Sequence, residues 1–136
     1  MSAEKNMACA RAAFENFTPL EPAWVANLHP DIVMEFPYGE DIGLPPRVEG
    51  KDQCAGLFQL VFTKLGLVFF DVEVSGMADP DGVLVECRGK GAFGDVIYNQ
   101  TYVIRLGFRD GKVILYREYF NTKVVVDAFG HLSALM

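Results

Sequence analysis

Residues 97–121, IYNQTYVIRLGFRDGKVILYREYFN, decide the fold. In the first half of this stretch, large apolar side chains alternate with smaller or polar ones, the pattern of a strand with one face on a core. The pattern breaks at Asp110-Gly111, a dipeptide that favours a tight turn between antiparallel strands. The stretch therefore predicts two long strands, Ile97–Phe108 and Lys112–Phe120, joined as a hairpin.

The turn decides which side chains of the second strand face the core, because a shift of one residue moves every side chain to the other face. In one alternative, Asp110-Gly111 form a two-residue loop, and Phe108 lies opposite Val113. Glu118 then faces outward.

In the other alternative, Arg109–Gly111 form a three-residue loop whose last residue is a left-handed bulge. Phe108 then lies opposite Lys112. Glu118 joins Tyr116 on the inner face. The residues of the hairpin leave both alternatives open.

The rest of the chain predicts helices set apart from a run of strands. Apolar residues recur at helical spacing near the N-terminus and in a broad stripe before Gly66. The predicted elements are, in order, helices Ala3–Phe17 and Pro22–Leu28, strand Asp31–Tyr38, a loop over Gly39–Gly50, a helix from Cys54 to Leu65, strands Leu67–Met77 and Val83–Phe93, the hairpin, and a helix over Lys123–Phe129. This order indicates an α+β fold.

The composition suits one domain over residues 1–136 and disfavours several partners. The chain has 12 Lys and Arg against 18 Asp and Glu, a net charge of −6, whereas binding to phosphates or to an anionic membrane needs a basic surface. We therefore expect neither a nucleic-acid partner nor a membrane. The three cysteines lack the spacing of a metal site or a disulfide framework, and the N-terminus does not resemble a signal peptide. We expect a cytoplasmic protein without a metal.

Two stretches carry a family resemblance, MEFPYG at 34–39 and FRDGKVILYREYFN at 108–121. Together with the element order, they resemble the nuclear transport factor 2-like superfamily, and within it the SnoaL-like proteins. The superfamily includes ketosteroid isomerase, limonene epoxide hydrolase, scytalone dehydratase, polyketide cyclases and phenazine-biosynthesis proteins. The resemblance implies a cone-shaped roll, with N-terminal helices packed on a strongly curved, mainly antiparallel sheet around an apolar pocket. Because one fold serves many activities, the site must be judged from its residues.

A homodimer is expected from the sheet itself. The middle strands carry bulky side chains on both faces, with Phe69, Val72 and Val74 on one face against Val68 and Phe70 on the other. The helices of a single chain cover only one face, and monomers rarely expose a large apolar patch. We expect the outer face to be covered by a second copy, as is common among the proteins that the chain resembles.

Glu118 is the strongest candidate for catalysis. In limonene epoxide hydrolase and the phenazine proteins, the matching position resembles a pocket carboxylate that acts as a general acid or base, and this resemblance favours the three-residue loop. A carboxyl group among aromatic rings has a raised pKa, as proton transfer near neutral pH requires. The alternative is a structural Glu118, at the surface or paired with Arg105 or Arg117.

Other catalytic groups of the resembled enzymes are absent. Where ketosteroid isomerase has its base and its protonated Asp, this chain has Phe36 and Ile104. Where limonene epoxide hydrolase has an Arg and an Asp, it has Val85 and Cys87. These two mechanisms are therefore not expected, and Cys87 is expected to be an inert buried thiol.

The leading hypothesis is an enzyme without a cofactor that isomerises, cyclises or dehydrates a small hydrophobic ring compound. Glu118 would move a proton, while Tyr98, Tyr102 and Gln100 would hydrogen-bond a substrate oxygen. The expected pocket residues besides these are Trp24, Met34, Phe36, Tyr38, Phe58, Phe62, Cys87, Tyr116 and Phe120. The alternative is a non-catalytic ligand-binding or dimerisation module of the same fold, which a surface-exposed, ion-paired Glu118 would favour.

Overall fold

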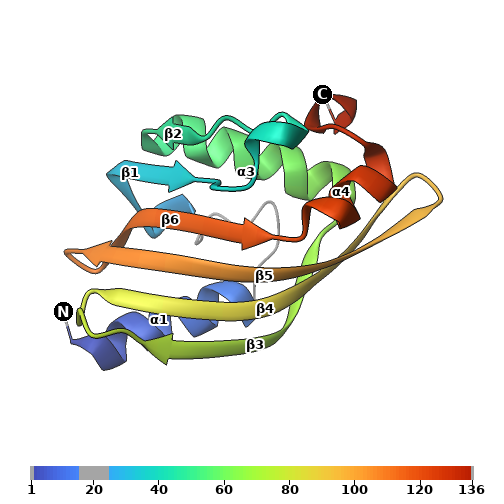
Figure 1. The fold of residues 1–136 in the computed structure, drawn as a ribbon. Coiled ribbons are helices and arrows are strands. Elements are labelled where there is room, and N and C mark those ends of the chain that lie inside the picture. Colours follow the sequence, from blue (N-terminus) through green and yellow to red (C-terminus); the bar gives the residue numbers. More distant parts are fainter. Residues whose placement is uncertain (1, 16–24, 136) are drawn as a thin grey trace.

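The structure, a computed structural model, describes residues 2–15 and 25–135 (Figure 1). Its elements are α1 (Ala3–Glu15), β1 (Leu28–Glu35), the 3-10 turn η1 (Glu40–Ile42), β2 (Arg47–Glu49), α3 (Lys51–Leu65), β3 (Val68–Gly76), β4 (Gly82–Phe93), β5 (Val96–Arg109), β6 (Lys112–Phe120), α4 (Thr122–Phe129) and the 3-10 turn η2 (Leu132–Leu135). None of the helices in these residues is long and apolar enough to cross a membrane.

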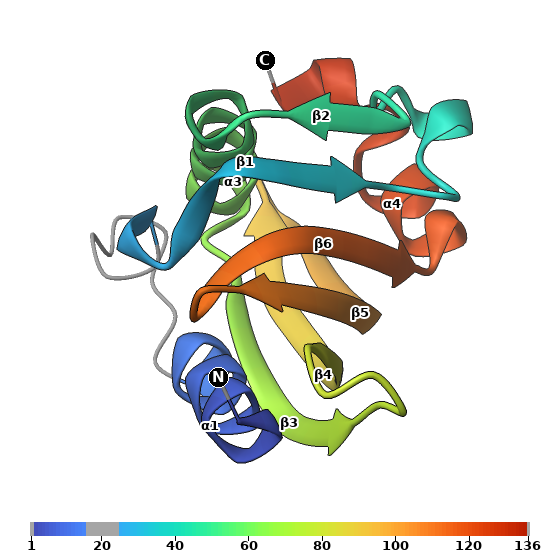
Figure 2. The same ribbon diagram turned by 90° about the vertical axis from the view of Figure 1, so that its left-hand side faces the viewer.

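The strands form one sheet in the order β2-β1-β6-β5-β4-β3. All neighbours are antiparallel except β1 and β6, which run parallel. The strands curve around the interior, with α1 packed on β3 and β4, and α3 packed on β1 and β2 (Figure 2). The predicted α+β class and the strongly curved, mainly antiparallel sheet are confirmed.

The helices bury the stripes that their sequences predict. In α1, Ala10 and Phe14 are buried one turn apart. In α3, every third or fourth residue from Cys54 to Leu65 is buried, which directs one face at the sheet. The helix ends as predicted at Gly66, whose left-handed conformation (φ 58°) lets its N–H bond the carbonyl of Phe62.

Two predicted elements near the N-terminus have different bounds. Of the predicted helix Pro22–Leu28, residues 22–24 lie outside the described part of the chain, and Leu28 already begins β1. The predicted strand Asp31–Tyr38 ends three residues early, at Glu35. Pro37 has no N–H for a strand partner, and the chain turns there, with the N–H of Gly39 bonded to the carbonyl of Phe36.

The predicted three-residue hairpin loop is wrong. Asp110 and Gly111 have φ values of 54° and 77°, and they form a two-residue turn. Two positive φ values define the turn type that matches the twist of paired strands. Phe108 accordingly lies opposite Val113.

A β-bulge further along the hairpin nevertheless turns Glu118 inward. Gly107 lies opposite Leu115, which leaves Ile114 as an extra residue in β6. A side chain on Gly107 would come within 3.1 Å of the Leu115 Cβ, so glycine allows the close approach at this point. Beyond the bulge, Glu118 lies opposite Ile104, whose side chain is fully buried in the core.

Candidate functional site

An apolar cavity of about 50 Å³ lies between the curved sheet and α3. The structure places many of the predicted site residues in its wall: Met34, Phe36, Phe58, Phe62, Tyr98, Tyr102, Glu118 and Phe120. They come from β1 and the residue that follows it, from α3, and from β5 and β6, so the curvature of the sheet brings distant segments together. No Lys, Arg or His is among the described residues that line it.

Glu118 is the one ionisable carboxyl group in the described wall of this cavity. Its side chain is buried, with 8% exposure, and its Oε1 accepts a hydrogen bond of 2.7 Å from the hydroxyl of Tyr116. Burial raises the pKa of Glu118 to about 7, while the hydrogen bond from Tyr116 lowers it in part. Protonated and ionised forms are therefore both populated near neutral pH.

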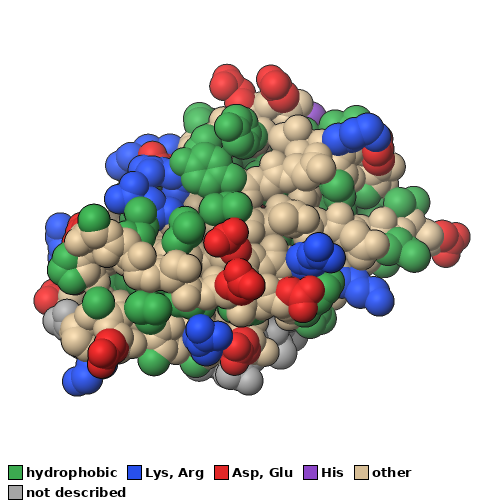
Figure 3. Space-filling model, turned by 60° about the horizontal axis from the view of Figure 1, so that its bottom comes forward, with side chains coloured by type: hydrophobic (Ala, Val, Ile, Leu, Met, Phe, Trp, Pro, Cys, Tyr) green, Lys and Arg blue, Asp and Glu red, His purple; other side chains and the backbone are tan. Residues whose placement is uncertain are grey.

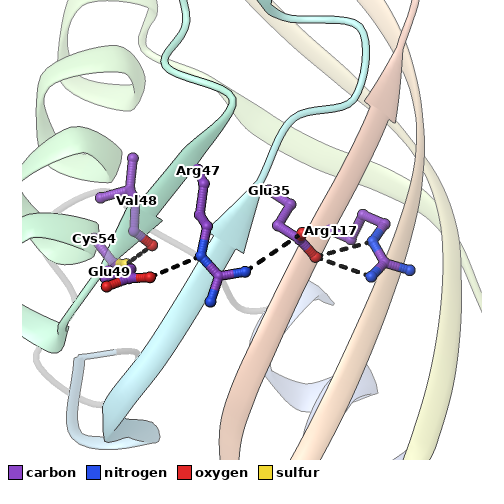
Figure 4. Close-up of polar contacts among 6 residues, drawn as sticks. All are labelled: Glu35, Arg47, Val48, Glu49, Cys54 and Arg117. Carbon is purple, nitrogen blue, oxygen red and sulfur yellow. Dashed lines mark hydrogen bonds and ion pairs between the residues drawn. The ribbon is translucent and has the colours of Figure 1, made fainter.

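The arginines expected as alternative partners do not neutralise Glu118. Arg117 donates from Nε and Nη2 to Oε1 of Glu35, at 3.1 and 2.9 Å. Glu35 is also within 3.8 Å of Arg47, which in turn bonds Glu49 at 2.8 Å (Figure 4). Arg117 is the neighbour of Glu118 in β6 and points to the opposite face of the sheet. In the described part of the chain, no ion pair involves Glu118.

Two phenols share the cavity with the carboxyl group. Burial raises the pKa of both Tyr98 and Tyr102, and the charge of Glu118 adds to this effect. The interaction between the two side chains lowers the pKa of Tyr98 and raises that of Tyr102, but for both phenols the effect of burial is larger. Both phenols stay protonated at neutral pH and can donate hydrogen bonds.

Gln100 does not line the cavity, contrary to the prediction. Its Nε2 donates to the Tyr98 hydroxyl at 3.0 Å and to the carbonyl of Asn121 at 2.9 Å. Its Oε1 accepts from the backbone N–H groups of Thr101 at 3.0 Å and Asn121 at 2.9 Å. An amide has two donor and two acceptor positions, so nothing remains for a substrate.

Tyr38 is wrongly predicted as a pocket residue. It is 60% exposed and packs against Tyr119, with ring centroids 5.8 Å apart. Because β1 ends at Glu35, the strand alternation that predicts an inward Tyr38 does not reach it.

Tyr116 and Cys87 are buried beside the cavity but do not form its wall. Tyr116 affects the cavity only through its hydrogen bond to Glu118, which lowers the pKa of that carboxyl group. Burial, and next the charge of Glu118, raise the pKa of the Cys87 thiol to about 12, which fits the inert thiol that the sequence predicts. Trp24 lies outside the described residues.

Sequence reasoning missed three wall residues of α3 and the side of the cavity formed by the segment around η1 and the C-terminal segment. The further wall residues are Ile42, Leu44, Leu57, Val61, Leu65, Val125, Phe129 and Leu132. Ile42 and Leu44 stand among glycines and prolines, and composition assigned that segment to a surface loop. The signal that could have found them is their size, since large apolar side chains in a polar loop need cover.

The loop and the C-terminal segment meet over the cavity. A Cβ on Gly43 would come within 2.2 Å of the His131 ring, so the ring lies directly against the backbone that follows η1. Phe129 packs against Tyr98 and Phe93, with centroid distances of 5.9 and 5.6 Å. Together α4 and η2 close one end of the cavity.

Comparison with known proteins identifies the family. Residues 10–116 match the SnoaL-like domain. The chain belongs to the SnoaL-like family. An uncharacterized PhzA/B-like protein of Pseudomonas aeruginosa is 33% identical over 113 residues, which cover 82% of this chain and 79% of that protein.

Two solved structures share the fold of this chain over nearly its whole length. A Bacillus subtilis protein provisionally named an isomerase is 29% identical, with a TM-score of 0.81 and 96% of both chains covered. A phenazine biosynthesis-related protein of Pseudomonas aeruginosa is 20% identical, with a TM-score of 0.77, 93% of this chain covered and 81% of that chain. The expected SnoaL-like resemblance and cone fold are confirmed.

Proposed function

We propose that this SnoaL-like protein is an enzyme that needs no cofactor and moves a proton on a neutral, hydrophobic ring compound, as an isomerase, a cyclase or a dehydratase. The observation that carries the proposal is Glu118, a carboxyl group with a pKa of about 7 in an apolar cavity. A group that titrates near the working pH serves equally as acid and as base. The isomerase name of a relative and the phenazine-biosynthesis name of another support this reaction class.

The polar groups of the cavity fit an enolisable carbonyl compound. Ionised Glu118 takes a proton from the carbon next to the carbonyl, the C–H pair moves into a new C=C bond, and the negative charge develops on oxygen. The hydroxyl of Tyr98 or Tyr102 donates a hydrogen bond to that oxygen and stabilises the charge. Glu118 then returns the proton to a different carbon or to the same one.

The size of the cavity implies that its wall moves when a substrate enters. About 50 Å³ holds a few water molecules, whereas pockets for small organic ligands are several times larger. Phe129 in α4 and Leu132 in η2 lie outside the sheet, so they can move without breaking it. A neutral ligand is favoured because the described wall holds no cation that would offset an anion.

Deuterium exchange tests the proposal without knowledge of the natural substrate. Ring ketones such as 2-tetralone, 1-indanone and cyclohex-2-enone are incubated with the protein in D₂O, and the loss of the α-proton signal is followed by NMR. We expect exchange above the solvent rate for at least one ketone, and a loss of about 10²–10⁴-fold in Glu118→Gln. The matched control is Glu86→Gln, which replaces an exposed carboxyl group on the outer face of β4. This variant should catalyse exchange at the wild-type rate.

Equal exchange rates for Glu118→Gln and the wild type would remove Glu118 from the mechanism. Ketone binding with no catalysed exchange in either protein would instead favour the non-catalytic ligand-binding module.

A further inference from the structure

Gln100 is a buried amide whose orientation in the fold is fixed. Its Oε1 accepts from two backbone N–H groups, those of Thr101 and Asn121. A flipped amide would set its NH₂ group against these two donors, so the NH₂ group must be the one that faces Tyr98. The side chain is 2% exposed, and water does not compete for these bonds.

The fixed amide determines what the Tyr98 hydroxyl can do. An N–H only donates, so the Tyr98 oxygen is the acceptor of the 3.0 Å bond from Gln100. A phenol oxygen has two acceptor positions and one proton. With Gln100 donating to this oxygen, the proton of Tyr98 cannot point at the amide and is left for the cavity that the ring lines.

We propose that Gln100 is a positioning residue, which holds the Tyr98 oxygen as an acceptor and so directs the Tyr98 proton at the substrate oxygen. The inference rests on the proposed function, since it assigns the oxyanion donor of that same reaction. Gln100 itself touches no substrate. The sequence predicted a direct hydrogen bond from Gln100 to a substrate oxygen. In the structure Gln100 can act on that oxygen only through Tyr98.

Gln100 also holds the junction between β6 and α4. It bonds both the N–H and the carbonyl of Asn121, as a neighbouring strand would, at the point where β6 has ended. Asn121 caps α4 through its own side chain, which accepts from the N–H of Lys123. Replacing Gln100 therefore disturbs α4 as well, and the test must separate the two effects.

The first measurement leaves Gln100 in place. Tyr98→Phe removes one oxygen, and the side-chain ¹H–¹⁵N signals of Gln100 report on its bonds. We expect one Nε2 proton signal to shift upfield and the other, bonded to Asn121, to stay. The matched control is Tyr119→Phe, on the outer face, which should shift neither of the two Gln100 Nε2 proton signals. If both Gln100 signals are unchanged in Tyr98→Phe, the proposal is overturned.

The second measurement is a double-mutant cycle with 4-nitrophenol at pH 6, whose ionised form mimics an enolate and is visible by its absorbance. We expect Gln100→Met to weaken binding of the ionised probe about tenfold, the loss of one hydrogen bond. In a Tyr98→Phe background the same change should cost less than about twofold, because the group it acts through is gone. Gln59→Met, at an exposed position of α3, controls for the substitution itself.

Equal losses in the two backgrounds would show that Gln100 acts through the α4 junction alone, and would overturn the proposal. If the wild type does not bind 4-nitrophenol, the proposed function is weakened, and the Gln100 signals still decide the link to Tyr98. The two failures are thus distinguishable.

Discussion

The hydroxyl of Tyr116 donates to Oε1 of Glu118 across 2.7 Å, from two positions earlier on the same strand. The bond favours the ionised carboxylate, yet burial has the larger effect and raises the pKa of Glu118 to about 7. Burial keeps the pKa of Tyr116 well above that of a free phenol, so it remains a donor at neutral pH. The carboxyl group is thereby held at one oxygen.

Removal of this hydrogen bond should raise the pKa of Glu118 further. We expect the Glu118 carboxyl of Tyr116→Phe to titrate above the wild-type value of about 7, because the ionised form loses its donor. The measurement is a ¹³C NMR titration of the carboxyl signal. The control Tyr119→Phe, on the outer face, should leave the pKa of Glu118 unchanged. A lower Glu118 pKa in Tyr116→Phe would contradict the arrangement.

The pKa of Glu118 predicts a pH-dependent stability. The folded state keeps the proton up to about pH 7, whereas the unfolded chain releases it near 4.5. Between these values the folded state binds more protons, so the contribution of Glu118 to the free energy of unfolding falls as the pH rises. The full loss, about 3 kcal/mol, is reached above pH 7.

Urea unfolding of the wild type and Glu118→Gln at pH 4 to 8 measures this effect. Glutamine does not titrate, so the difference between the two proteins cancels the other carboxyl groups. We expect Glu118→Gln to gain stability relative to the wild type as the pH rises. A constant difference across this range would mean that Glu118 has an ordinary pKa.

The C-terminal wall of the cavity should control entry of ligands. Leu132→Ala removes part of the wall, and we expect faster and tighter binding of 2-naphthol, followed by its fluorescence in stopped-flow experiments. Leu135→Ala, in the same turn, is the matched control: Leu135 is buried but does not line the cavity. Each change should destabilise the fold by about 2–5 kcal/mol. Identical binding rates in the two variants would exclude entry past Leu132.

We expect a homodimer through the outer face of the sheet. Val68, Phe70 and Ile97 are exposed there, Ile97 by 68%, and they line one apolar surface groove. Figure 3 shows hydrophobic side chains interspersed with acidic and basic ones on the face that it presents. Light scattering at micromolar concentration should give twice the chain mass of 15.1 kDa.

Ile97→Asp should return the mass to that of one chain, because a charge buried in the interface lacks a partner. Gln59→Asp, on the exposed side of α3, should remain dimeric. A wild-type protein with the mass of a single chain would refute the dimer.

The hairpin shows why sequence patterns predicted the fold better than the site. The alternation along residues 97–108 correctly predicted which side chains of β5 point to the core, because β5 pairs with β4 without interruption. The inward Glu118 was predicted for the wrong reason. The extra residue lies at Ile114, within an apolar run where no turn signal marks it, and not at Asp110-Gly111. A bulge of this kind depends on packing between strands.

The remaining errors concern residues whose placement depends on distant contacts. Gln100 faces inward as predicted, yet its side chain makes no contact with the cavity, because two of its four hydrogen bonds go to Asn121, 21 positions away. Leu132 and Phe129 reach the cavity because the C-terminal segment folds back over η1, which no local periodicity reports. Phe58 and Phe62, by contrast, lie on one helical stripe, and that stripe was sufficient to place them.

The extra residue at Ile114 also bears on how this cavity can change in evolution. In β6 a guanidinium and a carboxyl group occupy adjacent positions, Arg117 and Glu118, on opposite faces. Loss of the bulge with every residue of β6 kept would place Glu118 opposite Val103 and exchange the two side chains between the faces, so that a permanent cation would lie where a titrating acid now lies. The sign of the charge offered to a substrate is therefore set by the pairing of the hairpin as much as by its amino acids. Relatives with the same Arg-Glu pair but without the bulge would be selective for the opposite class of compound.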